Sequence, residues 1–474
     1  MEELNWLSAR TQVDLIKSRQ VSAVELMNCT YDQIERLNPA LNALVNLLPR
    51  EAAVALASAA DARDPQNCGP LHGLPMAPKD LLDLQGFPTT AGFVPYADRI
   101  AQDDSVLIAR QRSAGALAIG KSNVPEFGLG SHTFNALFGA THNPYDLEKT
   151  PGGSSGGAAA ALASGMLSVA DGSDMGGSLR NPASFCNVVG FRPSIGRVPP
   201  NQGFGWFGRL STAGAMARSV ADTALLFSVQ AGPYPPDPLT LPESGELFLD
   251  LPATDLQGMK IGFTADLKLV PVDSEVAAIC ESAAGVLAEL GAELTDECPD
   301  FSTAMEIFHT QRAASLAVMG RLMEQTLPNW RESAKDTAVW NIEKGMALTA
   351  DELLRSELLR IDLYQRVCHF FERYDALVLP AAQVPPFDSN LDWVKEINGQ
   401  PMATYIDWMT VCCAISVTGL PAISVPAGFT GTGLPVGLQI VGKPHGDFKL
   451  LQIAQAYEAA TQIGVRRPAI VDKN

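Results

Sequence analysis

Two short segments of the chain are dense in glycine and place serine hydroxyls beside paired glycines. The first runs from Pro151 to Gly157 (P-G-G-S-S-G-G) and the second from Gly172 to Arg180 (G-S-D-M-G-G-S-L-R). Glycine lets a backbone approach another group closely or adopt positive φ. Tight turns alone would explain one such loop. Two loops that both carry serines favour a site where hydroxyl groups do chemistry.

The chemistry open to these serines depends on a base. A serine hydroxyl is a poor nucleophile until a neighbouring group takes its proton. The chain has six histidines, and none of them lies in either serine loop. The pattern therefore indicates covalent catalysis at serine, with a base other than an adjacent histidine.

Two other patterns suggest competing chemistry. Gly115 to Ser122 (G-A-L-A-I-G-K-S) fits the phosphate-binding loop G-x-x-x-x-G-K-[ST], which must follow a strand and open a helix. Here a helix is expected before Gly115, and Ala116 to Gly120 is expected to be a strand. Gly152 to Gly156 fits the G-x-S-x-G nucleophile elbow of α/β-hydrolase esterases, but a turn-rich loop, Asn143 to Pro151, stands where the elbow needs a strand. We favour neither pattern.

Composition narrows the possible partners and cofactors. The 474-residue chain has a formal net charge of −18, which disfavours binding to nucleic acid. Its first residues lack the basic segment followed by an apolar segment that marks a signal peptide. It also has no run of about 18 apolar residues, the length of a membrane-spanning helix. We therefore expect a cytoplasmic protein with no membrane partner. The eight cysteines are expected to be free thiols, and no metal-ligand spacing occurs, so we expect no metal and no cofactor.

Further motifs accompany the two serine loops along the chain: Gly73-Leu74-Pro75, Lys79-Asp80-Leu81, Pro88 to Gly92, Gly120 to Phe127, Asn143 to Asp146, Gly190 to Ser194, Thr418 to Pro426 and Gly433 to Gln439. With both serine loops and these motifs in this order, the chain resembles the amidase signature family. The match covers roughly residues 20–205 and 400–460. The resemblance implies a catalytic core at about 60–205 and 400–460, and residues 230–395 would shape the substrate pocket.

The resemblance implies a role for each matching catalytic residue. Ser178 would be the acyl-forming nucleophile, Ser154 would follow a cis peptide bond and relay the proton, and Lys79 would be the base. A lysine can act as a base when burial lowers its pKa, and serine–lysine pairs are a known variant of the catalytic triad. Backbone N–H groups would form the oxyanion hole, from Met175, Gly176, Gly177 and Ser178.

Further residues are expected around this triad. Gly128 stands where some family members carry a pocket-lining methionine, so more room is expected there. Ser155 is expected to support Ser154 by hydrogen bonding. Arg180 could meet an acidic substrate, although a structural ion pair with Asp174 is favoured. The remaining candidates are Asp407 and Trp408, which could border the pocket or simply pack, and Lys121 and Asp80, which are interpreted as structural.

The elements that must position these residues alternate along the chain. Ser22 to Glu25 fits a helix capping box, and strands alternate with helices from there to the C-terminus. This alternation predicts an α/β fold in which helices cover both faces of a sheet. We expect one large, mixed, mostly parallel sheet and a single amidase domain spanning residues 1–474.

The function that follows is hydrolysis of a small-molecule carboxamide to a carboxylate and ammonia or an amine. Esters could be cleaved by the same machinery. The alternative within the family is the glutaminase component of a tRNA-dependent amidotransferase, but Phe308 to Ala314 does not resemble its glutamine-reading segment. An α/β-hydrolase-type esterase ranks below both. The acyl group, the amine and the oligomeric state stay open, with a homodimer as the assembly considered.

Overall fold

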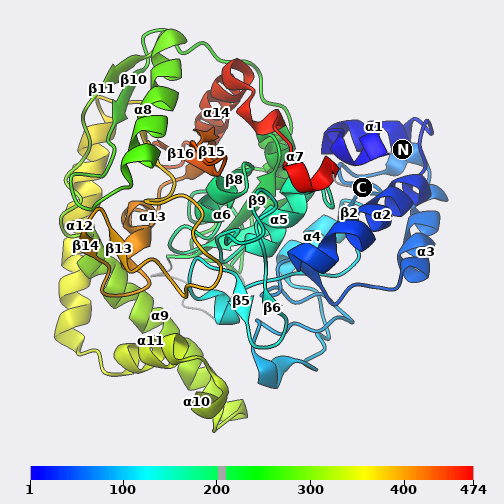
Figure 1. Ribbon diagram of the computed structural model, residues 1–474, viewed down its shortest axis with the longest axis horizontal. Coiled ribbons are helices and arrows are strands. Elements are labelled where there is room, and N and C mark those ends of the chain that lie inside the picture. The colour runs from blue at the N-terminus through cyan, green and yellow to red at the C-terminus, as the bar shows by residue number, and fades with distance from the viewer. Residues whose placement is uncertain (1, 201–209, 473–474) are drawn as a thin grey trace.

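An eight-stranded sheet lies at the centre of the computed structural model, which describes residues 2–200 and 210–472 (Figure 1). The strand order across the sheet is β11-β10-β12-β16-β15-β8-β9-β7. Strands from distant parts of the chain are therefore neighbours. The strands are β7 (Val169–Asp174), β8 (Val189–Arg192), β9 (Thr212–Ala217), β10 (Lys260–Phe263), β11 (Glu293–Thr295), β12 (Ala376–Pro380), β15 (Ala422–Phe429) and β16 (Pro435–Gly442).

The strand directions correct one detail of the expected fold. The mixed sheet and the α/β class are confirmed, but the sheet is not mostly parallel. Among the described residues of this eight-stranded sheet, β10 pairs in parallel with β11 and with β12. The other pairings in the same sheet are antiparallel. A short turn joins β15 to β16, and such a connection allows only antiparallel pairing. The sequence pattern predicts strands at residues 260–264, 293–295, 376–379, 422–426 and 436–441, and β10, β11, β12, β15 and β16 are present there. It does not predict β8 and β9.

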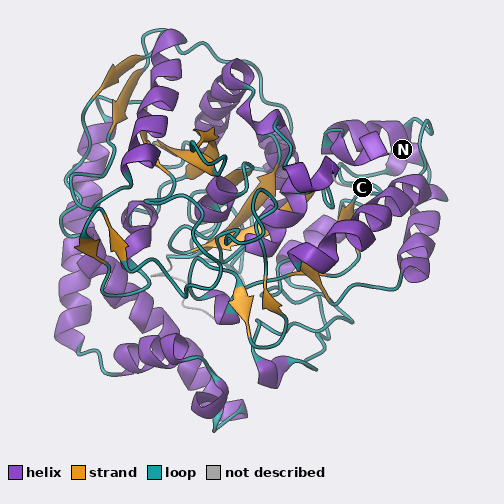
Figure 2. Cartoon of the chain, in the orientation of Figure 1, coloured by secondary structure: helices purple, strands orange, loops and turns teal. Residues whose placement is uncertain are grey.

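Helices cover both faces of the sheet, as expected (Figure 2). One group, α7, α8 and α14, packs on the sheet and makes contacts within itself. α5 packs on β7 and β9, and α6 packs on β15 and β16. Every residue of β12 and β16 is buried, as is typical of strands covered on both faces. The helices of the sheet layers are α5 (Gly156–Ala163), α6 (Arg180–Phe185), α7 (Val220–Gln230), α8 (Ser274–Glu289), α13 (Thr410–Ser416) and α14 (Asp447–Thr461).

The N-terminal part forms a separate helical group beside the sheet (Figure 1). Its longest helix begins with the predicted capping box, in which Ser22 and Glu25 satisfy each other's backbone N–H groups. This group comprises α1 (Ala9–Lys17), α2 (Ala23–Leu41), α3 (Arg50–Asp61) and α4 (Val106–Ser113). Four two-stranded sheets complete the strands: β1 (Leu44–Val45) with β4 (Lys121–Ser122), β2 (Pro75–Met76) with β3 (Leu117–Ala118), β5 (Phe134–Asn135) with β6 (Gly139–Ala140), and β13 (Glu396–Ile397) with β14 (Gln400–Pro401).

A second helical layer lies at the other side of the sheet (Figure 1). It consists of α9 (Ala304–Thr326), α10 (Trp330–Ser333), α11 (Asp336–Met346) and α12 (Ala350–Phe371). Its helix α9 packs on α13, and Phe370 of α12 lies against Gly262 of β10. No helix among the described residues is long and apolar enough to span a membrane. All eight cysteines are free thiols, as expected. The prediction of a single domain over residues 1–474 stays a prediction.

Candidate active site

Lys79 lies in the first residues after β2, and the sheet holds its backbone in place. Its backbone N–H donates to Asp171 Oδ1 on β7 at 2.8 Å, and it forms a parallel bridge with Ser122. The side chain is fully buried. This hydrogen bond joins the backbone of Lys79 to a side chain 92 positions away in the sequence.

Serine oxygens surround the Lys79 amino group. Nζ lies 2.9 Å from Ser154 Oγ, 2.8 Å from Ser155 Oγ and 3.1 Å from Ser173 Oγ. Burial lowers the pKa of Lys79 to about 7, although the charges of Asp174 and Asp171 oppose this shift. A large fraction of the amine is therefore neutral near pH 7, and only a neutral amine can accept a proton.

The first serine loop is fixed by hydrogen bonds to its backbone. The peptide bond between Gly153 and Ser154 is cis, the conformation expected before this serine. Ser131 Oγ donates to the Gly153 carbonyl at 2.6 Å, and Thr133 Oγ1 donates to the Gly152 carbonyl at 2.8 Å. These bonds leave Ser154 Oγ directed at Lys79 Nζ.

The contacts of Ser155 differ from the expected hydrogen bond to Ser154. Its hydroxyl contacts the lysine, and its backbone N–H donates to the Ser178 carbonyl at 3.3 Å. No hydrogen bond between the hydroxyls of Ser155 and Ser154 occurs in the described structure. Ser155 therefore connects the two serine loops through Lys79 and Ser178.

The second serine loop joins the end of β7 to α6. Ser178 is partly exposed, two residues before α6 begins. Among the described residues, its hydroxyl has no hydrogen-bond partner, so it is free to meet a ligand. The sequence predicts a short helix over residues 179–186, in which Pro182 is tolerated near the first turn, and helix α6 (Arg180–Phe185) is present there.

The amides of this loop are not all available for an oxyanion. Gly177 N–H donates to Asp174 Oδ1 at 2.8 Å, which corrects its assignment to the oxyanion hole. In the part of the chain that the structure describes, the amides of Met175, Gly176 and Ser178 have no acceptor. Gly177 has φ +112, and a Cβ there would lie 2.7 Å from Asn181 Nδ2. Glycine is therefore required at position 177 for the turn rather than for a donor.

Asp174 and Arg180 form the structural ion pair that was favoured for them. Arg180 Nε donates to Asp174 Oδ2 at 2.9 Å and Nη2 to Oδ1 at 2.8 Å, and both side chains are fully buried. Burial alone would raise the pKa of Asp174, but the guanidinium groups of Arg180 and Arg192 hold it well below its usual range. Arg180 is committed to this pair and is not placed to bind substrate.

Gly128 lies beside Ser154. It has φ +69, and a Cβ built on it would lie 2.8 Å from Leu81 Cδ1 and 3.4 Å from Ser154 Oγ. The room expected at this position is therefore occupied by the Leu81 side chain. Any larger residue would clash with Leu81 unless that side chain moved, and its Cβ would be in contact with the Ser154 hydroxyl.

Three groups near the site were missed by sequence reasoning. Asp171 and Ser173 lie on β7 and contact Lys79, and a Cβ on Gly176 would lie 2.8 Å from Phe308 Cζ of α9. An aspartate directly after the apolar residues Val169 and Ala170 of this strand was the available signal for Asp171. Nothing in the spacing indicated that Phe308 would reach this loop.

The two competing patterns lack their structural context. The phosphate-loop pattern at Gly115 to Ser122 contains strands β3 and β4 instead of opening a helix. Within it, Lys121 is buried 3.7 Å from Asp80, the structural role expected for both. Ser154 follows a loop, with no strand in residues 150–153. It therefore lacks the strand that precedes a nucleophile elbow.

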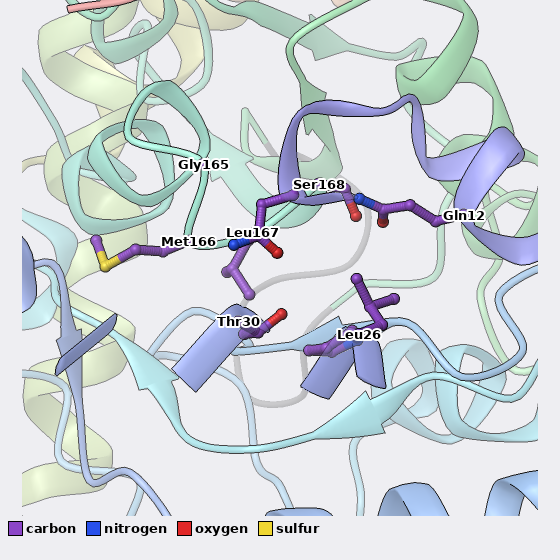
Figure 3. A pocket seen from close by; sticks show the side chains of 9 residues that line it. Gln12, Leu26, Thr30, Gly165, Met166, Leu167 and Ser168 are labelled. Atoms are coloured by element: carbon purple, nitrogen blue, oxygen red, sulfur yellow. The ribbon is translucent and has the colours of Figure 1, made fainter. Parts of the chain in front are cut away.

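None of these residues lines a small cavity elsewhere in the fold. It lies between the N-terminal helices and the segment Gly165 to Ser168, with Gln12, Leu26 and Thr30 on its wall (Figure 3). Its volume is about 10 Å³, room for about one water molecule. Gln12 Oε1 is buried nearby without a hydrogen-bond partner in the described structure. This cavity is too small for an organic substrate.

The fold and these loops define an α/β enzyme of the amide-hydrolysing class. The chain belongs to the Amidase family, which it matches over residues 25–451, and so to the amidase signature enzymes. It is a hydrolase that acts on amide carbon–nitrogen bonds.

Relatives of two kinds are similar to this chain over nearly its whole length. An acylamidase of Rhodococcus erythropolis is 34% identical, with 99% of this chain and 98% of that protein aligned. The A subunit of the glutamyl-tRNA(Gln) amidotransferase of Dehalococcoides mccartyi is 33% identical, over 97% and 98%. A crystal structure of a bacterial aryl acylamidase has a TM-score of 0.89 and 31% identity, over 98% and 99%.

Proposed function

We propose that the protein hydrolyses small carboxamides through an acyl-enzyme, with Ser178 as nucleophile, Ser154 as proton relay and Lys79 as base. The observation that carries this proposal is the buried Lys79 Nζ, which lies 2.9 Å from Ser154 Oγ. A buried amine with a pKa of about 7 suits proton transfer near neutral pH.

The proposed reaction has two halves. Ser178 Oγ attacks the amide carbonyl while its proton moves through Ser154 to Lys79, and the oxyanion is bound by the free amides of Met175, Gly176 and Ser178. The proton then passes to the amide nitrogen, the carbon–nitrogen bond breaks, and ammonia or an amine leaves. Water attacks the acyl ester by the same relay, which releases the carboxylate and restores Ser178.

The acylamidase relatives support an N-acyl amide, including an anilide, as the substrate class. The expected test reaction is anilide hydrolysis in the presence of hydroxylamine. An acyl-enzyme partitions between water and hydroxylamine, so the hydroxamate should form while the rate of aniline release is maintained. Ser178→Ala should abolish both products. Hydroxamate formation by Ser178→Ala at the wild-type rate would refute the assignment of the nucleophile.

A second candidate function is the glutaminase reaction of a tRNA-dependent amidotransferase. It is favoured by the 33% identity to the Dehalococcoides mccartyi protein over nearly the whole of both chains. This candidate predicts ammonia release from glutamine, and the first predicts aniline release from anilides. Measuring both on the isolated chain separates them.

A further inference from the structure

A cavity of about 220 Å³ is lined by the segment that follows Gly128. Leu129 to His132 form one wall, and the start of α11 forms another. The first of these walls adjoins the proposed site at two points. Gly128 approaches Ser154 Oγ, and Ser131 Oγ donates to the carbonyl before Ser154. A ligand in this cavity would therefore lie next to the first serine loop.

The charged group in this cavity is the Lys335 ammonium. Nζ donates to the Leu129 carbonyl at 2.6 Å and lies 5.8 Å from the centre of the Phe134 ring. No carboxylate of the described residues lies within ion-pair distance of it. An ammonium has three hydrogens to donate, so part of its capacity is left for a ligand.

Two further donors in the cavity have no acceptor. Trp393 Nε1 is buried without a hydrogen-bond partner among the described residues. The Tyr405 hydroxyl oxygen accepts from Arg312 and, at 2.7 Å, from Asn341. Those bonds use its lone pairs, and no described residue accepts the hydrogen of Tyr405. The ring centroids of Trp393 and Tyr405 lie 6.4 Å apart, so both side chains could donate hydrogen bonds to the same group of a ligand.

The positive charge extends behind Tyr405. The Arg312 guanidinium is buried, lies 5.4 Å from the centre of the Tyr405 ring, and has no carboxylate partner in the described residues. Buried charges in proteins are normally paired. Asp336 and Asp392 also line the cavity, but both are exposed to solvent at its rim. The interior therefore offers unpaired donors and cations, and the buried Glu126 carboxylate nearby accepts the Lys335 backbone N–H at 2.8 Å.

We propose that this cavity binds the non-reacting end of the amide substrate and selects an end that carries a carboxylate. The proposal rests on the proposed function and names the substrate class of that site. A carboxylate accepts several hydrogen bonds at once and would satisfy Lys335, Trp393 and Tyr405 together. The aromatic rings of Phe134, Trp393 and Trp408 favour a flat or apolar stem between that carboxylate and the amide.

The test is the dissociation constant of matched amides, measured by calorimetry on Ser178→Ala, which binds without turnover. One pair is pentananilide and the monoanilide of glutaric acid, which places the carboxylate on the acyl part. The other is acetanilide and 4-acetamidobenzoate, which places it on the amine part. The carboxylate member of at least one pair should bind about tenfold or more tightly, as expected for charge-assisted hydrogen bonds.

Lys335→Met in the Ser178→Ala background should remove that preference, so that the two members of each pair bind with similar affinity. Lys344→Met is the matched control, since Lys344 lies on the helix that follows Lys335 but is exposed and outside the cavity. Equal affinities within both pairs, tighter binding of the neutral members, no binding of any amide, or a preference that survives Lys335→Met would overturn the inference. Failure of the proposed function would appear separately, as the absence of anilide hydrolysis by the wild-type chain.

Discussion

Lys79 Nζ is bounded by serine hydroxyls and makes no ion pair within the described residues. Burial without a counter-ion disfavours the ammonium form, whereas the nearby Lys121 lies 3.7 Å from Asp80. Two buried lysines on adjacent segments thus have different surroundings. The difference makes Lys79 the candidate base and Lys121 a structural residue.

The pH dependence of activity follows from the Lys79 pKa of about 7. Because burial lowers this pKa from 10.5, the amine is neutral above about pH 7 and protonated below it. We expect kcat/KM for an anilide to rise with pH through about 7 and to fall tenfold per unit at more acid pH. A profile that is flat from about pH 5 to 9 would exclude a lysine base.

Asp171 should influence the base strength of Lys79. Its carboxylate accepts the Lys79 backbone N–H, and its charge raises the pKa of the amine. Asp171→Asn keeps an acceptor for that N–H but removes the charge. We expect the acid limb of the kcat/KM profile to move by about one unit to lower pH.

Asp171→Ala serves as the companion variant, because it loses the acceptor as well as the charge. A purely structural role for Asp171 predicts that both variants lower kcat and leave the position of the acid limb unchanged. That outcome would contradict an electrostatic role.

At the scale of elements, the turn between β7 and α6 sets the geometry of the second serine loop. Asp174 at the end of β7 accepts bonds from Gly177 N–H, Leu179 N–H and the Arg180 guanidinium. The carboxylate thereby fixes which amides of the turn face inward and which stay free beside Ser178. The buried pair is thus part of the architecture of the proposed oxyanion hole.

Removing Arg180 should therefore be costly. Arg180→Met leaves the buried Asp174 with only its more distant arginine neighbour, Arg192, at 3.5 Å. We expect a loss of about 3 kcal/mol in the free energy of unfolding, measured by urea titration. The control is Arg321→Met at an exposed ion pair with Glu324, where about 0–1 kcal/mol is expected. Equal losses in the two variants would argue against a structural role for the buried pair.

Some elements could be predicted from the sequence because their signals are local. The capping box of Ser22 and Glu25 and the short helix after Ser178 depend only on nearby residues. The direction of each strand cannot be predicted from nearby residues, because it depends on which strand it pairs with after a long connection. The contact of Lys79 with Ser154, 75 residues away, was likewise indicated only by the family resemblance. No spacing rule predicts the unpaired donors around Lys335.

At the scale of the whole molecule, one sheet joins the serine loops to the C-terminal strands. β7 and β8 flank the second serine loop and α6, and β8 pairs with β15 in the same sheet. The terminal segments also meet, since Arg467 lies 3.4 Å from Glu3. Every group required by the proposed mechanism comes from this single chain.

We therefore expect the isolated chain to be active without a partner protein or tRNA. The measurement is anilide hydrolysis across a gel-filtration profile, with activity expected to coincide with the peak of the pure chain. Activity that appears only after an amidotransferase partner and tRNA are added would favour the glutaminase alternative.

The most direct test of the central claim is the intact mass of the protein after treatment with a fluorophosphonate, a reagent that phosphonylates an activated serine. The account predicts one label on the wild-type chain and none on Ser178→Ala, with slower labelling of Ser154→Ala and Lys79→Met because the relay is broken. Labelling that survives Ser178→Ala but vanishes in Ser154→Ala would contradict it and make Ser154 the nucleophile.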